Sequence, residues 1–123
     1  WAVNNSFGGE IFVPKIPSYN VMDLKEAIAP SCDHEIIGLR PGEKIHEEMI
    51  TQSDGESTID LGKYYAILPS DGNLLDKYTD SSVRYLKTEN DFTYNSGTNT
   101  VFLNVDQIRS LIKLNVDKDF QPV

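Results

Sequence analysis

The sequence predicts an α+β fold in which short strands and short helices mix within one small domain. Runs of β-branched and aromatic residues, closed by Pro or Gly, alternate with amphipathic segments. No segment repeats another, and no linker-like composition divides the chain. The glycine-rich turn G-x-G-x-x-G is absent, so a complete doubly wound sheet with a dinucleotide site is not predicted.

The first half of the chain contains four predicted elements. They are a frayed helical end at residues 1–7, a strand over residues 10–13, a helix over residues 21–29 and a short buried strand over residues 35–39. Asn20 is the predicted N-cap of the helix, and Pro30 ends it. Lys15 lies in an extended loop between two prolines, where we expect it to be solvated rather than bound to a ligand.

The turn after the 35–39 strand is the most informative stretch of the sequence. Pro41-Gly42 separates Arg40 from Glu43, a pair typical of a chain reversal, and the apolar spacing that follows predicts a helix over residues 43–50. Ligands of α/β proteins collect at the carboxyl ends of strands. Arg40 and Glu43 are therefore the candidate binding residues.

The chemistry of these two side chains suits a nucleoside diphosphate. The planar guanidinium of Arg40 matches phosphate, and the ionised carboxylate of Glu43 can accept both hydroxyl protons of a ribose diol. Amide groups at a helix start would add to the anion site. The alternative is an exposed Arg–Glu pair around a turn, which contributes little. The residue types alone leave both interpretations open.

The second half is less regular. We expect a mobile loop over residues 51–57, a strand over 63–68, a turn at Asp71-Gly72, weak helical spacing over 74–89 and a loop over 90–99. Asn104 and Gln107 form a capping-box pattern ahead of a helix over residues 105–114. Residues 115–123 are expected to form a disordered tail.

Composition excludes several classes of function. The net charge is −8 and the pI is near 4.6, which argues against binding nucleic acid or an anionic membrane. One cysteine, Cys32, allows no internal disulfide and fits the reducing cytoplasm. The sequence contains no run of 18 apolar residues, so no membrane span is predicted. It also contains no H-E-x-x-H or paired cysteine motif, so no metal site is predicted.

Four segments in order resemble a known family. They are GGEIFVPKIPS at residues 8–18, RPGEKIHEEMI at 40–50, TIDLGKYYAILPS at 58–70 and YNSGTNTVFLNVDQIRSLI at 94–112. Together they are similar to the carboxy-terminal part of the soluble, inverting UDP-N-acetylglucosamine 4,6-dehydratases. These belong to the extended short-chain dehydrogenase/reductase family, which makes sugars for bacterial surface polysaccharides and flagellin glycans.

The resemblance implies that residues 1–123 are the substrate-binding part of a Rossmann-type enzyme whose cofactor-binding core lies outside this chain. The opening at Trp1 rather than Met fits that expectation. It implies NADP, a UDP-sugar substrate and a homo-oligomer for the whole enzyme. Arg40 then matches the arginine that contacts the diphosphate or ribose, and Glu43 the ribose-binding carboxylate. None of the six tyrosines begins the family's Tyr-x-x-x-Lys pair, so no catalytic or cofactor-binding residue is assigned here.

Two alternatives remain open at this stage. A UDP-sugar 4-epimerase of the same family would use the same nucleotide-binding residues. A non-catalytic module could instead dock a protein partner through its aromatic side chains, which are Phe12, Tyr64, Tyr65, Phe92 and Tyr94. The sequence favours the soluble inverting dehydratases through the FVPKIPS segment, where the larger membrane-anchored relatives carry a different sequence.

Overall fold

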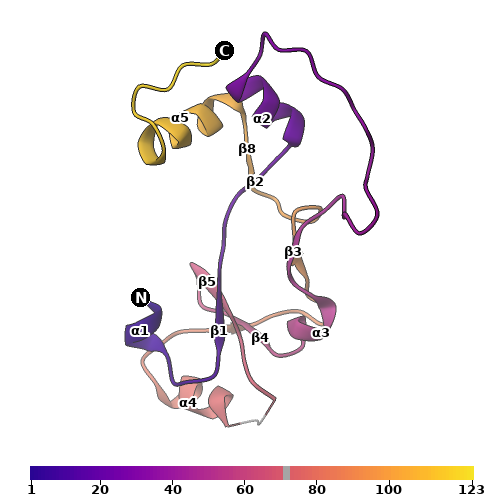
Figure 1. Ribbon diagram of the computed structural model, residues 1–123. Coiled ribbons are helices and arrows are strands. Elements are labelled where there is room, and N and C mark those ends of the chain that lie inside the picture. Colours follow the sequence, from indigo (N-terminus) through magenta and orange to yellow (C-terminus); the bar gives the residue numbers. More distant parts are fainter. Residues whose placement is uncertain (71–72) are drawn as a thin grey trace. The chain divides into compact units, whose positions relative to one another are not determined.

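The computed structural model describes residues 1–70 and 73–123, and the predicted turn at Asp71-Gly72 lies outside these described residues. They divide into two compact units (Figure 1). Unit 1 comprises Trp1–Ile16 and Glu48–Thr98, and unit 2 comprises Pro17–Glu47 and Asn99–Val123. Both units combine short helices with short strands, which confirms the predicted α+β class.

Unit 1 is built on a four-stranded antiparallel sheet. Its strands, in spatial order, are β1 (Ile11–Pro14), β5 (Tyr64–Ile67), β4 (Thr58–Asp60) and β6 (Leu86–Lys87). Ala66 pairs with Phe12 on one side and with Ile59 on the other. The strands predicted over residues 10–13 and 63–68 are therefore confirmed, and they pair with each other.

The core of unit 1 lies where helix α4 (Leu74–Asp80) covers this sheet. Ile59, Ala66, Leu74 and Tyr78 form one buried cluster, with Tyr78 only 1% exposed. A second aromatic group packs around helix α1 (Ala2–Asn5), where the ring of Trp1 stacks on Tyr64. The aromatic residues considered as a docking surface thus contact other aromatic rings within unit 1.

Two predicted loops of unit 1 are wrong. Residues 51–57 contain helix α3 (Gln52–Gly55), whose first turn is closed by the Thr51 hydroxyl accepting from the Asp54 amide. Residues 90–99 contain β7 (Tyr94–Asn95), which pairs antiparallel with β3 (Glu48–Ile50). Ile50 of β3 is fully buried and pairs with Tyr94, so the burial of β3 accounts for the order of β7 within the polar stretch 90–99.

Unit 2 consists of a helix pair and a two-stranded parallel ladder. The elements are β2 (Ser18–Tyr19), α2 (Val21–Ile28), β8 (Phe102–Leu103) and α5 (Val105–Asn115). Asn20 caps α2, and Asn104 with Gln107 forms the full capping box of α5, as predicted. Arg109 of α5 donates to the carbonyls of Glu26 and Ala27, which satisfies acceptors at the end of α2.

The segment that joins α2 to β3 is irregular. The strand predicted over residues 35–39 and the helix over 43–50 are both wrong, because residues 31–47 form neither helix nor strand and all are exposed. The tail after α5 makes two backbone hydrogen bonds beside α2, from Val123 N–H to the Ile28 carbonyl and from Ser31 N–H to the Val123 carbonyl. Disorder of residues 115–123 stays a prediction.

Candidate functional site

The Arg40–Glu43 stretch forms a closed turn. The amide of Glu43 donates to the carbonyl of Arg40 over 3.0 Å, and Gly42 has a φ of +87°. Pro41 and Gly42 therefore occupy the two central positions of a type II turn, because proline presets the first and glycine tolerates the positive φ of the second. The predicted reversal at Pro41-Gly42 is present, although neither the strand before it nor the helix after it forms.

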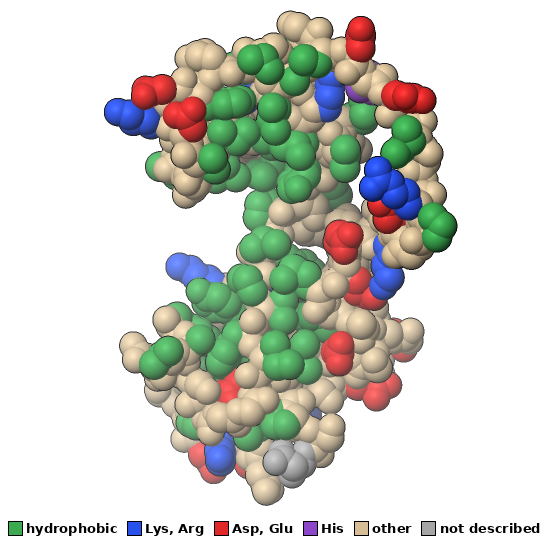
Figure 2. Space-filling model, in the orientation of Figure 1, with side chains coloured by type: hydrophobic (Ala, Val, Ile, Leu, Met, Phe, Trp, Pro, Cys, Tyr) green, Lys and Arg blue, Asp and Glu red, His purple; other side chains and the backbone are tan. Residues whose placement is uncertain are grey.

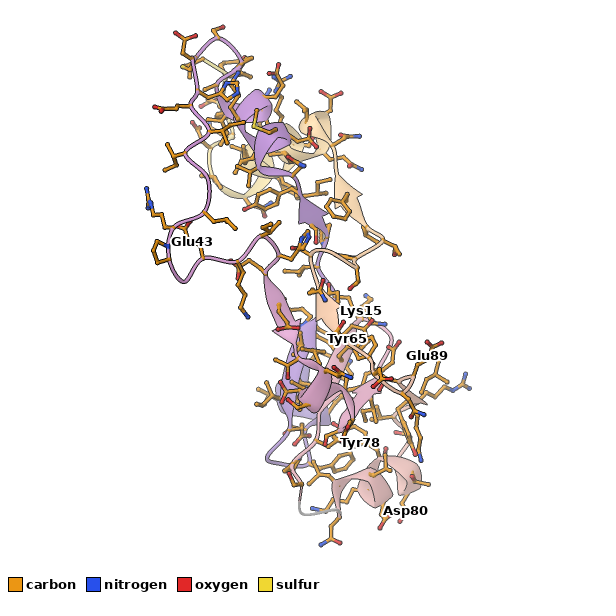
Figure 3. The ribbon with its side chains drawn as sticks, turned by 90° about the vertical axis from the view of Figure 1, so that its right-hand side faces the viewer. Lys15, Glu43, Tyr65, Tyr78, Asp80 and Glu89 are labelled. Atoms are coloured by element: carbon orange, nitrogen blue, oxygen red, sulfur yellow. The ribbon has the colours of Figure 1, made fainter. Side chains whose placement is uncertain are left out.

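The Glu43 carboxylate stabilises this turn through one oxygen. Its Oε2 accepts from the Arg40 amide over 2.9 Å, whereas Oε1 lies 3.8 Å from the Arg40 guanidinium. The two side chains are 71% and 48% exposed, respectively, so this ion pair contributes about 0–1 kcal/mol. A ligand reaching the turn from solvent finds a guanidinium without close contact and a carboxylate already oriented by the backbone. Figure 3 shows Glu43 on the irregular segment of unit 2.

Lys15 is an exposed loop residue, as predicted, but its side chain also makes contacts that the sequence does not predict. Its ammonium group lies 2.7 Å from both carboxylate oxygens of Asp60 and 4.4 Å from the centroid of the Tyr65 ring (Figure 3). Burial raises the pKa of the Tyr65 hydroxyl. The lysine is therefore committed to contacts within unit 1, which leaves it little capacity to hold a phosphate.

Tyr94 fixes the residue after Lys15. Its hydroxyl donates to the Ile16 carbonyl over 2.7 Å and accepts from the Ile16 amide over 2.8 Å. A side chain thus takes the place of a strand partner at the carboxyl end of β1. The sequence does not predict the contacts of Lys15 and Ile16, because their partners Asp60 and Tyr94 are far from residues 15 and 16 in the chain.

Glu10 is a second charged group bound within unit 1. Its Oε1 accepts from the Phe7 amide over 2.6 Å and from the Tyr78 hydroxyl over 3.1 Å, whereas Oε2 is buried without a partner among the described residues. Burial alone would raise the pKa of Glu10, but hydrogen bonds from the Glu10, Phe7 and Gly8 amides and from Tyr78 lower it below its usual value. Burial and the bond to Glu10 raise the pKa of Tyr78.

The described residues do not fit a dinucleotide cofactor. Such a site needs a glycine-rich turn that leads from a strand into a helix, so that backbone amides approach a pyrophosphate. The junctions β2–α2, β3–α3 and β8–α5 instead pass through Asn20, Thr51 and Asn104, whose side chains cap the helices. Within the same residues, no group of three His, Cys, Asp or Glu could hold a metal ion.

None of the helices in the described part of the chain combines the length and the apolar character that crossing a bilayer requires.

Comparison with known proteins shows which family this chain resembles. The sequence profile described as "Polysaccharide biosynthesis protein" matches residues 1–69. A UDP-N-acetylglucosamine 4,6-dehydratase (inverting) of Campylobacter jejuni is 42% identical over 110 residues, which cover 85% of this chain and 33% of the relative. A UDP-glucose 4-epimerase of Rickettsia bellii is 32% identical over 115 residues, which cover 89% of this chain and 32% of that enzyme.

A solved structure also resembles this chain. The X-ray structure of Pen from Bacillus thuringiensis superposes with a TM-score of 0.69 at 25% identity, covering 90% of this chain and 33% of that chain. This chain thus spans about a third of the length of the curated relatives that it matches. The profile match over more than half of the chain, with the dehydratase and epimerase relatives, shows that it belongs to the polysaccharide biosynthesis protein family.

Proposed function

We propose that this chain supplies the nucleotide-binding part of an inverting UDP-N-acetylglucosamine 4,6-dehydratase. The observation that carries the proposal is the 42% identity to the Campylobacter jejuni enzyme over 85% of the chain, against 32% for the Rickettsia epimerase. We further propose a cytoplasmic enzyme that makes sugars for a bacterial surface glycan.

The turn geometry supports a division of roles between Arg40 and Glu43. The exposed guanidinium of Arg40 suits the diphosphate, because it can donate two parallel hydrogen bonds to phosphate oxygens. Oε1 of Glu43 makes no hydrogen bond within 3.5 Å to Arg40 and suits a ribose hydroxyl, while Oε2 keeps the turn closed. Binding energy at this distant end of the substrate would orient the sugar at its reacting carbons.

The chemistry itself is assigned to other parts of the protein. A 4,6-dehydration of this kind requires NADP to take up and return a hydride, and the described residues do not fit that cofactor. We therefore place binding and orientation of the UDP portion on this chain and no covalent step.

The test uses the whole gene product with UDP-N-acetylglucosamine. We expect Arg40→Ala to lower kcat/KM at least ~10-fold, which corresponds to about 1.4 kcal/mol of lost transition-state binding. Lys118→Ala removes an exposed positive charge elsewhere in unit 2 and serves as the control. An Arg40→Ala enzyme with unchanged kcat/KM and unchanged circular dichroism would refute the assigned role.

A UDP-sugar 4-epimerase is the second candidate, because the Rickettsia relatives bear that name and match at 30–32% identity. The product separates the two reactions. Dehydration yields a 4-keto-6-deoxy sugar that is lighter than the substrate by one water, whereas epimerisation leaves the mass unchanged. Mass spectrometry of the reaction mixture therefore decides between them, and the role of Arg40 is tested independently of that outcome.

A further inference from the structure

Residues 35–39, which lead directly into the Arg40–Glu43 turn, have the composition of a strand without its structure. Ile36, Ile37 and Leu39 are 81%, 66% and 57% exposed. The trace between α2 and β3 carries neither helix nor strand over these residues (Figure 1). Within the described part of the chain, no hydrogen bond joins the backbone of residues 33–39 to another group. The segment thus combines strand-forming residues with the absence of a strand partner there.

The order of the apolar residues indicates which kind of strand they suit. Successive side chains of a strand point to opposite faces of the sheet, so Ile36 would lie on one face and Ile37 with Leu39 on the other. A strand with one solvated face alternates apolar and polar residues, whereas a strand covered on both faces carries a continuous apolar run. Residues 36–39 contain no polar side chain. They therefore suit a sheet that is covered on both faces.

Gly38 allows this segment to adopt either an irregular or an extended backbone. Among residues 35–39, only Gly38 has a positive φ, of +74°, which departs from the extended conformation. Glycine adopts left-handed and extended angles with similar ease. No atom lies within 4 Å of a β-carbon built on Gly38, so its surroundings within the described residues do not hold it in the left-handed conformation.

The described residues offer no suitable partner strand. In unit 2, β2 and β8 have two residues each and pair with each other. The longest outer strand of the described residues is β1, and its carboxyl end is closed, because Pro14 has no N–H and the Tyr94 hydroxyl binds both backbone groups of Ile16. The matches to the Campylobacter jejuni dehydratase and to Pen cover 33% of each, so about two thirds of either relative lies outside the matched region.

We propose that residues 35–39 pair, in the whole protein, with a strand from the part beyond residues 1–123. The pairing sets Gly38 to an extended φ and covers Ile36, Ile37 and Leu39 on both faces of a sheet. Arg40 then lies at the carboxyl end of a strand, where α/β proteins bind their ligands. The pairing thereby fixes the position of the turn that binds UDP, a consequence that rests on the proposed function.

Hydrogen exchange of the whole gene product tests the pairing without any ligand. Amides of an exposed irregular segment exchange almost as fast as in an unfolded chain, whereas amides paired in a sheet exchange far more slowly. We expect the amides of residues 36–39 to exchange at least ~100-fold more slowly than in an unfolded chain. Ile37→Pro should abolish this protection, because proline is excluded from the interior of a sheet. Asp33→Pro, outside the predicted strand, is the control and should keep it.

Free exchange of these amides in the wild type would overturn the proposal. Protection that disappears on dilution would assign the partner strand to a second copy of the protein, and would overturn it as well. Retained protection in Ile37→Pro would show that the segment is covered without strand pairing, with the same consequence.

A matched pair of glycine substitutions tests the backbone conformation. Gly38 and Gly42 have φ angles of +74° and +87°, and each has open space around a built β-carbon. Alanine disfavours the left-handed conformation but fits the extended one. In the whole gene product, we expect Gly38→Ala to keep the dissociation constant for UDP within about 2-fold of the wild type. Gly42→Ala should raise it about 5- to 30-fold.

Equal losses in the two variants would mean that Gly38 stays left-handed in the whole protein, and would overturn the proposed pairing. The proposed function fails by a different result. If Arg40→Ala binds UDP as tightly as the wild type, the role of the turn is refuted, whereas slow exchange of residues 36–39 would still establish the strand.

Discussion

At the scale of single residues, the candidate site depends on one backbone angle. Gly42 has a φ of +87°, and no atom lies within 4 Å of a β-carbon built at this position. A substitution here therefore strains the backbone of the turn without a steric clash. A substitution of Gly42 therefore tests the geometry of the turn alone, because the side chains of Arg40 and Glu43 stay unchanged.

We predict that Gly42→Ala weakens UDP binding while leaving overall stability intact. The left-handed conformation costs an alanine about 1–2 kcal/mol, which the exposed turn can relieve by opening. Titration calorimetry with UDP should show a dissociation constant about 5- to 30-fold higher, the range that those energies correspond to. An unchanged constant would mean that the closed turn is not required.

The contribution of Lys15 to stability, through its contacts with Asp60 and the Tyr65 ring, can be measured by substitution. We predict that Lys15→Met lowers the free energy of unfolding by about 1 kcal/mol, through loss of the partly exposed pair with Asp60 and of the contact with the Tyr65 ring. Urea denaturation measures the change. Lys63→Met, at a position that makes no ion pair within the described residues, should stay within about 0.5 kcal/mol of the wild type.

Glu10 gives the molecule a specific response to acid. Its pKa in the folded protein lies below its ordinary value of 4.5, so the stabilisation is complete above pH 4.5 and is lost as the pH falls through the folded pKa. We predict that the stability difference between wild type and Glu10→Gln narrows steadily below pH 4.5. Urea midpoints measured from pH 7 downwards check this, and a constant difference over that range would contradict it.

At the scale of elements, helix α3 depends on a close approach of two backbones. A β-carbon built on Gly55 would lie 1.9 Å from the carbonyl oxygen of Phe92. We predict that Gly55→Ala destabilises unit 1 by about 1–3 kcal/mol, since the β3–β7 region must shift to admit the methyl group. Thermal unfolding measures this. Ser53→Ala, exposed on the same helix, is the control and should change little.

The elements that the sequence predicted correctly are those with local signals. Asn20 and Asn104 cap their helices through side chains that bond two or three residues ahead, so the pattern is visible in the sequence. The strand over residues 35–39 was predicted from an apolar run alone, and no partner orders it among the described residues. Helix α3 carries a local signal that the prediction overlooked, because Thr51 caps it by accepting from the Asp54 amide, while the close approach of the buried Gly55 to Phe92 is not visible in the sequence.

At the scale of the whole molecule, the family resemblance was the most reliable prediction from the sequence. It used four separated segments in order, and the profile match and the dehydratase relatives bear it out. The roles of Arg40 and Glu43 stay proposals, which the Arg40→Ala and Gly42→Ala variants test. The contacts of Lys15 with Asp60 and of Ile16 with Tyr94 could not be predicted, because the fold brings together residues that are far apart in the sequence.

Apolar side chains remain widely exposed on the visible surface of each unit (Figure 2), and composition alone does not reveal this exposure.

The interleaving of the two units has a consequence for biosynthesis. Ile11 of β1 emerges from the ribosome long before its partner Ile67, and α2 must wait for α5 near the end of the chain. At ~5–20 residues per second, each early element stays without its partner for on the order of several seconds. During that interval the nascent polypeptide exposes the apolar residues of β1 and a solitary helix α2, which only the synthesis of β5 and α5 can cover.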